Sequence, residues 1–160
     1  MKSILLISLY GLGFITLLGI AVVGTLLWAR NLSQKHSKIL YKVRNPKGIE
    51  VLEPVEIGGI KQWLHIRGRN VDNPILLFIH GGPGLPHIGW YDEMQRPWED
   101  YFTVVQWDQR QVGKSYFSLK ENTHTLNNEK NVADAKEVVA YLLSRFNKEK
   151  IFVMGSSYGS

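Results

Sequence analysis

Residues Ile151–Ser160 read IFVMGSSYGS, a short apolar run that leads into a serine with a glycine two positions away on each side. The pattern G-x-S-x-G centres on Ser157, between Gly155 and Gly159. After an apolar strand it is typical of a sharp strand-to-helix turn that lifts a serine hydroxyl above a sheet, because only small neighbours fit where the backbone folds back. Ser157 is therefore the candidate nucleophile. Ser156 lacks the flanking glycines, and the preceding strand argues against the alternative of a structureless Gly/Ser terminus.

A second glycine motif, HGGPG, occupies residues 80–84 directly after the apolar run Ile75–Ile79. At this composition HGGPG is expected by chance about 0.0002 times and G-x-S-x-G roughly 0.08 times, so HGGPG is the more specific signal. Glycines suit a loop whose N–H groups must approach a tetrahedral oxyanion without side chains in the way. The sequence predicts an oxyanion hole made by the N–H of Gly82, with Gly81 as the alternative, and by the N–H of Tyr158.

Two further features have structural rather than catalytic explanations. His80 resembles a general base, but the base of this arrangement follows the serine in chain order, so we expect His80 to brace the glycine loop. Residues 107–115 read WDQRQVGKS, and the terminal Gly-Lys-Ser resembles a phosphate loop, which would need a glycine where Asp108 stands. We expect Asp108 and Arg110 to hold the turn after a strand, as parts of a structural ion pair.

Apolar runs and helical patterns alternate along the chain after residue 48. GIEVLEPVEI and IKQWLHIR flank Gly58-Gly59, which predicts an antiparallel hairpin, with Pro54 on an edge or bulged strand. Further strands are expected at Ile75–Ile79, Phe102–Trp107 and Lys150–Met154, and helices at about Ile88–Arg96 and Asn128–Phe146. The longer helix should bury an apolar stripe that starts at Val132. This order predicts an α/β fold, with a hairpin followed by parallel strands and crossover helices.

The N-terminus has a different composition. Ser3–Trp28 contains 26 residues without a charge, enough to cross the ~30 Å hydrocarbon core of a bilayer as a tilted helix. A secretory signal peptide is the alternative, but its apolar region runs about 7–15 residues and ends in a cleavage site that is not evident here. We therefore expect a transmembrane anchor at 1–29, a basic juxtamembrane linker at 30–48 and a folded domain at 49–160.

Charge is unevenly distributed along the chain. The net charge is +5, but the seven Lys and Arg residues before Glu50 are accompanied by no acidic residue, whereas 12 Lys and Arg face 14 Asp and Glu from Glu50 onward. The basic segment suits anionic lipid headgroups, and no basic patch is left for nucleic acid. The positive-inside bias favours a cytoplasmic domain, although the short N-terminal tail favours the opposite side.

Without cysteine, disulfides and a thiolate nucleophile are excluded, and no cofactor fingerprint or metal-ligand cluster is evident. The oligomeric state stays open.

Together, HGGPG, WDQRQVGKS and GSSYGS resemble the proline iminopeptidase family of α/β-hydrolases over about Glu50–Ser160. The resemblance implies a serine hydrolase that releases an N-terminal residue, commonly proline, from a peptide. It implies Ser157 as nucleophile and the HGGPG loop with Tyr158 as oxyanion hole. Gln111 stands where the family usually has glycine, and Tyr158 where it usually has tryptophan. Relatives with this framework include esterases, so a membrane-anchored esterase or other amide hydrolase acting on a small acyl substrate is the alternative.

The remaining parts of a catalytic triad are not found after the serine. An Asp or Glu and then a His are expected downstream, but only Tyr158, Gly159 and Ser160 follow Ser157. All five histidines precede it: His36, His65, His80, His87 and His124. The sequence therefore predicts the N-terminal half of a hydrolase, truncated after the nucleophile turn and inactive by itself. The alternative is a non-catalytic anchored module.

Overall fold

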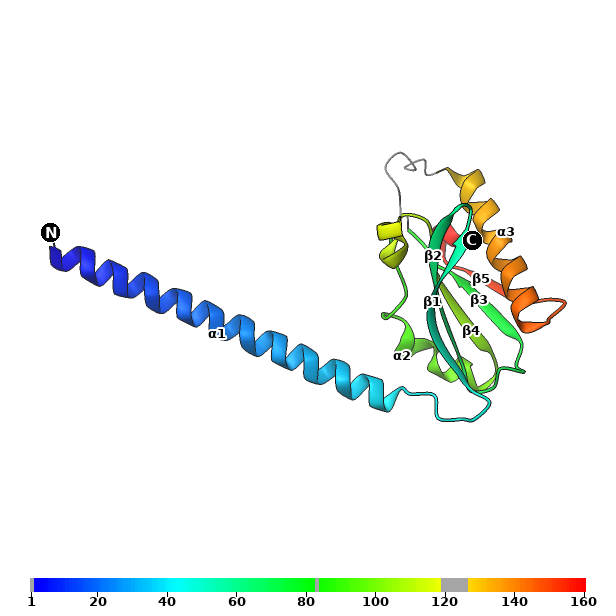
Figure 1. Ribbon diagram of the computed structural model, residues 1–160, viewed down its shortest axis with the longest axis horizontal. Helices are drawn as coiled ribbons and strands as arrows, with labels where there is room; N and C mark the ends of the chain where they lie inside the picture. Colours follow the sequence, from blue (N-terminus) through cyan, green and yellow to red (C-terminus); the bar gives the residue numbers. More distant parts are fainter. Residues whose placement is uncertain (1, 83, 119–126) are drawn as a thin grey trace. The chain divides into compact units, whose positions relative to one another are not determined.

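The computed structural model describes residues 2–82, 84–118 and 127–160. The chain divides into two compact units, Met1–Lys42 and Val43–Ser160, which are taken in turn (Figure 1).

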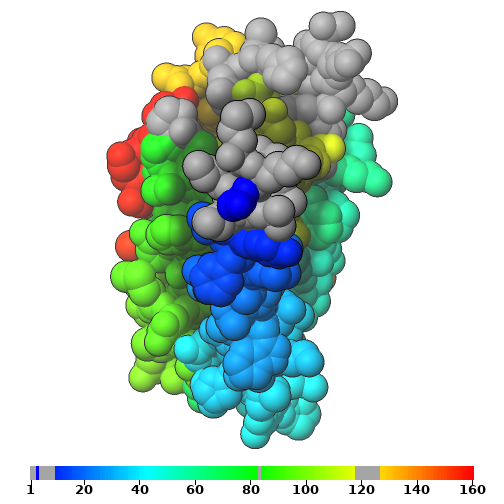
Figure 2. Space-filling model, turned by 90° about the vertical axis from the view of Figure 1, so that its left-hand side faces the viewer, coloured from blue at the N-terminus to red at the C-terminus, as the bar shows by residue number. Residues whose placement is uncertain are grey.

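The first unit is one long helix, α1, which spans Lys2–Leu40. Tyr10–Leu40 has a mean hydropathy of 2.2, and its residues are exposed except Ser37, which is half-buried (blue to cyan in Figure 2). The helix is long and apolar enough to cross a membrane, a test that a signal sequence also passes. It continues past residue 29, so the first part of the basic linker is helical.

The second unit contains a five-stranded sheet. Its strands are β1 (Ile49–Ile57), β2 (Ile60–Gly68), β3 (Ile75–Ile79), β4 (Thr103–Asp108) and β5 (Phe152–Gly155). The spatial order is β1-β2-β4-β3-β5; β2 is antiparallel to β1 and β4, and β3 is parallel to β4 and β5. The predicted α/β fold class is confirmed, including the hairpin with Gly58 and Gly59 at positive φ and Pro54 on an edge strand.

Two α-helices and three short 3-10 helices accompany the sheet in the described part of this unit. They are α2 (Asp92–Gln95), η1 (Arg96–Asp100), η2 (Gly113–Ser118), α3 (Asn128–Phe146) and η3 (Ser157–Gly159). The prediction of α3 is confirmed at both ends. The prediction of a helix from Ile88 is wrong, because Gly89 adopts a φ of 85° in a turn and the α-helix begins only at Asp92.

The main core lies between α3 and the sheet. Val138 and Leu142 are fully buried there with apolar residues of four strands: Ile57, Leu64, Ile66, Ile75, Leu77, Val105 and Trp107. The placement of Val132 in the buried stripe is wrong, since 55% of its surface is exposed. At about 100° per residue it lies roughly 120° around the helix from Val138. Asp134, one turn before Val138, is the buried residue, with 1% exposed.

β5 forms one edge of the sheet, and its apolar side chains are exposed. Phe152, Val153 and Met154 expose 54%, 53% and 42% of their surface. Strands of a parallel sheet are ordinarily covered on both faces. Among the described residues no strand pairs with the outer edge of β5.

Candidate active site

The turn after β5 has the backbone conformation of a strained nucleophile turn. Ser157 is exposed and has a φ of 53°, in the left-handed region that non-glycine residues avoid. Such strain costs about 1–3 kcal/mol and is concentrated at functional sites. The N–H of Ser156 donates to the carbonyl oxygen of Ile79 at 3.1 Å, which fixes the turn to the end of β3.

The two glycines of G-x-S-x-G are required because backbones touch at both positions. A methyl group on Gly159 would lie 2.7 Å from the carbonyl oxygen of His80 and would overlap that of Ile79. A methyl group on Gly155 would lie 2.7 Å from the carbonyl carbon of Gly159. A side chain on Gly159 would push the serine turn away from the end of β3, and one on Gly155 would force the turn itself open.

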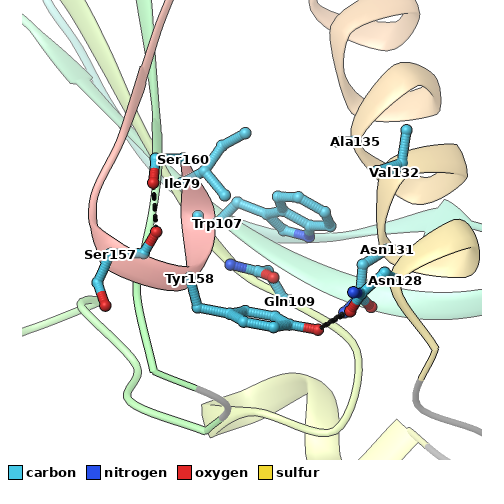
Figure 3. Close-up of a pocket in the computed structure, with 11 residues that line it drawn as sticks. Ile79, Trp107, Gln109, Asn128, Asn131, Val132, Ala135, Ser157, Tyr158 and Ser160 are labelled. Carbon is cyan, nitrogen blue, oxygen red and sulfur yellow. Dashed lines mark hydrogen bonds between the residues drawn. The ribbon is translucent and has the colours of Figure 1, made fainter.

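The HGGPG loop lies directly against the serine turn. A Cβ atom on Gly81 would overlap the carbonyl oxygen of Ser156 and would lie 2.8 Å from Cβ of Ser157. Because β3 and β5 are parallel neighbours, the loop and the turn leave the sheet at the same end. The hydroxyl of Ser157 lies on the side of the turn away from Trp107 and Tyr158 (Figure 3).

The side chain of His80 joins the glycine loop to the turn after β4. His80 is 2% exposed, its Nδ1 lies 3.1 Å from the carbonyl oxygen of Gly81, and its Nε2 lies 3.3 Å from the N–H of Gln109. An Nε2 that accepts from a backbone N–H must be unprotonated, so the ring is neutral with its proton on Nδ1. Burial lowers the pKa of His80 in agreement with this. Both nitrogens are occupied, as a bracing role requires.

A pH dependence of stability follows from His80 and His87. Burial lowers the pKa of both imidazoles below the ordinary value of 6.5, and for His87 the neighbouring His80 adds to the effect. The folded state therefore binds fewer protons than the unfolded state, so the free energy of unfolding should be highest above pH 6.5 and fall as the pH drops below it. Urea denaturation at a series of pH values measures this slope.

Burial raises the pKa of Asp108, so this residue changes the dependence of stability on pH in the direction opposite to that of the two histidines. The contribution of the two histidines to the pH slope is obtained by comparing the native protein with His87→Gln and with the double variant His80→Gln/His87→Gln. Both variants should show a shallower fall, whereas His36→Gln in α1 should match the native protein. An unchanged slope in both variants would contradict the assignment.

Asp108 closes the turn that leads into η2. Its Oδ2 accepts from the N–H of Lys114 at 2.8 Å, and its carbonyl oxygen accepts from Oγ of Ser115 at 2.6 Å. Ser115 Oγ in turn accepts from the N–H of Trp63 on β2 at 2.9 Å. Asp108 therefore organises the end of β4, as a structural role requires.

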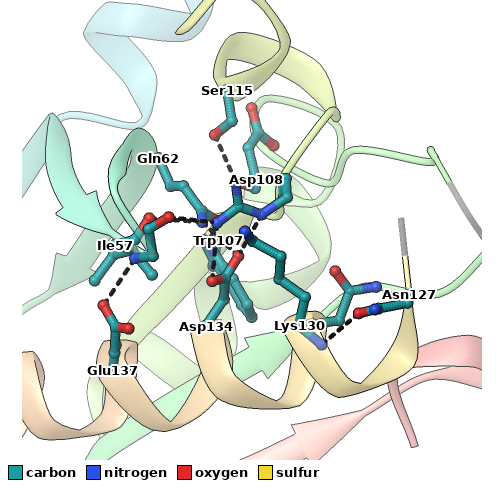
Figure 4. Close-up of polar contacts among 12 residues, drawn as sticks. Ile57, Gln62, Trp107, Asp108, Ser115, Asn127, Lys130, Asp134 and Glu137 are labelled. Atoms are coloured by element: carbon teal, nitrogen blue, oxygen red, sulfur yellow. Dashed lines mark hydrogen bonds and ion pairs between the residues drawn. The ribbon is translucent and has the colours of Figure 1, made fainter. Parts of the chain in front are cut away.

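The expected ion pair between Asp108 and Arg110 is wrong, because Arg110 pairs with Asp134 of α3 instead. Its Nε and one terminal nitrogen lie 2.9 and 3.0 Å from the two carboxylate oxygens, and both residues are 1% exposed. The same terminal nitrogen donates to the carbonyl oxygen of Gly58 at 2.8 Å. Gln62 donates to Asp134 at 2.7 Å and accepts from the indole of Trp107 at 2.9 Å (Figure 4). This buried network joins the β1–β2 hairpin, the turn after β4 and α3.

Gln111 has a φ of 64°, which explains why glycine is expected at this position. Replacing it with glycine should remove left-handed strain that costs roughly 1–2 kcal/mol, less the added entropy of the unfolded chain. We expect Gln111→Gly to raise the free energy of unfolding by about 1 kcal/mol in urea denaturation. Gln111→Ala loses the same contacts beyond Cβ but keeps the strain, so it should be less stable than Gln111→Gly; the reverse order would contradict the explanation.

Two hollows lie beside the serine turn. One, of about 220 Å³, is lined by the glycine loop, by Gln111 and Tyr116, and by Tyr158. The other, of about 510 Å³, lies between η3 and the start of α3 (Figure 3). The hydroxyl of Tyr158 donates to Oδ1 of Asn128 at 2.5 Å and accepts from Asn131 at 3.3 Å. Tyr158 therefore lines both hollows and is tied to α3.

Within the described residues, no histidine is hydrogen-bonded to Ser157; His124 lies outside them. The arrangement thus contains a candidate nucleophile and candidate oxyanion donors without a base in contact.

The sequence between residues 74 and 160 matches the model of the alpha/beta hydrolase fold family. The chain belongs to this family. A probable aminopeptidase from Bacillus subtilis (strain 168), YbaC, is 44% identical over 114 residues, which cover 71% of this chain and 36% of that protein. The chain thus spans about a third of the length of this curated relative.

Two solved structures of this hydrolase fold are also similar. A proline iminopeptidase-related protein from Thermus thermophilus is 24% identical with a TM-score of 0.56, over 69% of this chain and 37% of that one. A bacterial membrane phospholipase A is 21% identical with a TM-score of 0.59, over 94% of this chain and 44% of that one. Since Val43–Ser160 is less than 94% of the chain, the second match extends into α1. At these identities both show the fold alone.

Proposed function

We propose that the chain provides the nucleophile and the oxyanion hole of a membrane-anchored serine hydrolase. The observation that carries the proposal is the left-handed Ser157 two residues after the end of β5, so close to Gly81 of the HGGPG loop that a Cβ on Gly81 would lie 2.8 Å from that of Ser157. In the reaction Oγ of Ser157 attacks a carbonyl carbon, and the oxygen that becomes negative accepts from the N–H groups of Tyr158 and Gly82, or of Gly81. Each such donor contributes about 10²–10³-fold to kcat.

The substrate we favour is a peptide whose N-terminal residue, commonly proline, is released. The names of the Bacillus aminopeptidase and of the iminopeptidase-related protein support this choice. A second candidate is an esterase or another amide hydrolase, including one that acts on a lipid ester. The similarity of a membrane phospholipase A over a region that includes α1 favours this candidate.

A serine hydroxyl needs a base to accept its proton and a carboxylate to orient that base. His80 is occupied by Gly81 and Gln109, and no carboxylate or imidazole follows Ser157 in this chain. We propose that both groups come from residues of the full-length protein outside this chain, which spans 36% of its curated relative. The 160-residue chain alone should then fail to react with a serine-directed fluorophosphonate. Reaction of the short chain at the rate typical of serine hydrolases would contradict this.

The proposed activity is tested with the full-length protein on the naphthylamides of proline, alanine and leucine beside simple esters. Release of naphthylamine, highest from proline, would support the peptidase. Turnover of esters alone would replace it with the second candidate. A folded full-length protein that hydrolyses neither class and does not react with fluorophosphonate would overturn the hydrolase proposal.

We also propose that α1 is a single-pass anchor and that the positive-inside bias places the domain in the cytoplasm. A reporter enzyme fused after Gln34, active only on one side of the membrane, tests the orientation.

A further inference from the structure

The last three turns of α1 carry an apolar stripe on one face. At about 100° per residue, Trp28, Leu32 and Ile39 lie within roughly 40° of one another, whereas Ser37 lies on the opposite face. The three apolar side chains are 67%, 55% and 61% exposed. They line a hollow of about 520 Å³ together with Lys35, which lies on the same face. This segment follows the uncharged part of the helix.

The length of α1 requires part of the helix to lie outside the hydrocarbon core. The 26 uncharged residues Ser3–Trp28 extend about 39 Å, longer than the ~30 Å core, so a helix that buries all of them must tilt. A tilted helix turns one face toward the bilayer surface where it emerges. An apolar stripe on that face can enter the boundary between headgroups and acyl chains, with Trp28 at the level where indole rings are favoured.

The charges in this segment specify the kind of lipid. Arg30, Lys35, Lys38 and Lys42 are all basic, and no acidic residue occurs before Glu50. Their long side chains can reach phosphate groups while the stripe stays immersed. We infer that Trp28–Leu40 is an interfacial segment that lies in the headgroup layer and prefers anionic phospholipids over zwitterionic ones. The inference depends on α1 being the membrane anchor proposed above.

The 160 residues contain no cysteine, so single spin labels can be placed at chosen positions of this chain, in a full-length protein from which any cysteine outside it has been replaced by serine. Leu32→Cys and Ile39→Cys place labels on the stripe, Ser37→Cys is the matched control on the opposite face, and Leu18→Cys reports on the membrane span. Each labelled protein is reconstituted in vesicles of phosphatidylcholine, with or without phosphatidylserine. The accessibility of the label to oxygen is compared with its accessibility to a water-soluble nickel chelate.

We expect the labels at residues 32 and 39 to be accessible to oxygen and protected from nickel, and the label at 37 to show the reverse. The protection should increase with phosphatidylserine, and this increase should be lost in Lys35→Gln/Lys38→Gln and at high salt. Equal nickel accessibility at 32, 37 and 39, with residue 18 immersed, would overturn the inference and leave the anchor intact. An accessible residue 18 would overturn both. Spin–spin broadening at 32 and 39 would overturn the inference in favour of pairing between two copies of α1.

Discussion

Replacing Ser157 with alanine is expected to lower the kcat of the full-length protein by on the order of 10⁶-fold, the loss seen when the nucleophile of a serine triad is removed. The loss is this large because Ser157 alone of the three residues between Gly155 and Gly159 has a left-handed φ, so the hydroxyls of Ser156 and Tyr158 do not take its position. Turnover of the best naphthylamide or ester measures it. Thermal unfolding should be almost unchanged, since Ser157 is exposed.

Ser156→Ala is the matched control. Ser156 is also exposed, and its contact with Ile79 is made by the backbone N–H, which alanine retains. Its kcat should stay within about tenfold of the native value, the range of one neutral hydrogen bond. Activity that survives Ser157→Ala and disappears in Ser156→Ala would show that Ser156, and not Ser157, is the nucleophile.

Replacing Asp134 with alanine is expected to cost about 3–5 kcal/mol of unfolding free energy, because the guanidinium of Arg110 would remain buried without its carboxylate. Asp134 also accepts from Gln62, so a second buried donor would lose its partner. Urea denaturation of the full-length protein measures the change. A loss of this size is a large fraction of the stability of a typical domain.

Two variants separate the buried charge from general damage to α3. Glu137→Ala removes a carboxylate three residues along the same helix, one that is exposed and accepts from the N–H of Gly58 at 2.7 Å. It should cost no more than about 1.5–3 kcal/mol, the value of a hydrogen bond to a charged group. Arg110→Met/Asp134→Leu should recover part of the loss, since no charge is left unpaired. If Asp134→Ala costs no more than Glu137→Ala, the network is not a main source of stability.

The elements that depend on local signals could be predicted from the sequence. The Gly58-Gly59 hairpin is specified by two adjacent glycines at a turn that needs positive φ. α3 is specified by its apolar spacing, with Asn127 as an N-cap whose side chain accepts from Lys130 at 2.7 Å. The predicted helix around Ile88–Arg96 is longer than α2, because the left-handed φ of Gly89 prevents the α-helix from including residues 88–91.

The contacts of the site depend on positions far apart in the chain and could be predicted only in part. The motifs placed the glycine loop and the serine at the ends of two strands, and the pairing of β3 with β5 brings these ends together. The partner of Arg110 could not be predicted, because Asp134 lies on another element and an acidic residue on a helix is usually solvated. The sequence did contain one indication that Asp134 is buried, namely its position one helical turn before Val138, on the buried face of α3.

The crystal structure of the full-length protein after reaction with a fluorophosphonate is the most direct test of the proposed site. We predict a covalent bond between phosphorus and Oγ of Ser157. One phosphonyl oxygen should lie within hydrogen-bonding distance of the backbone nitrogens of Tyr158 and of Gly82 or Gly81. An adduct on another residue, or a phosphonyl oxygen that points away from the HGGPG loop, would contradict it.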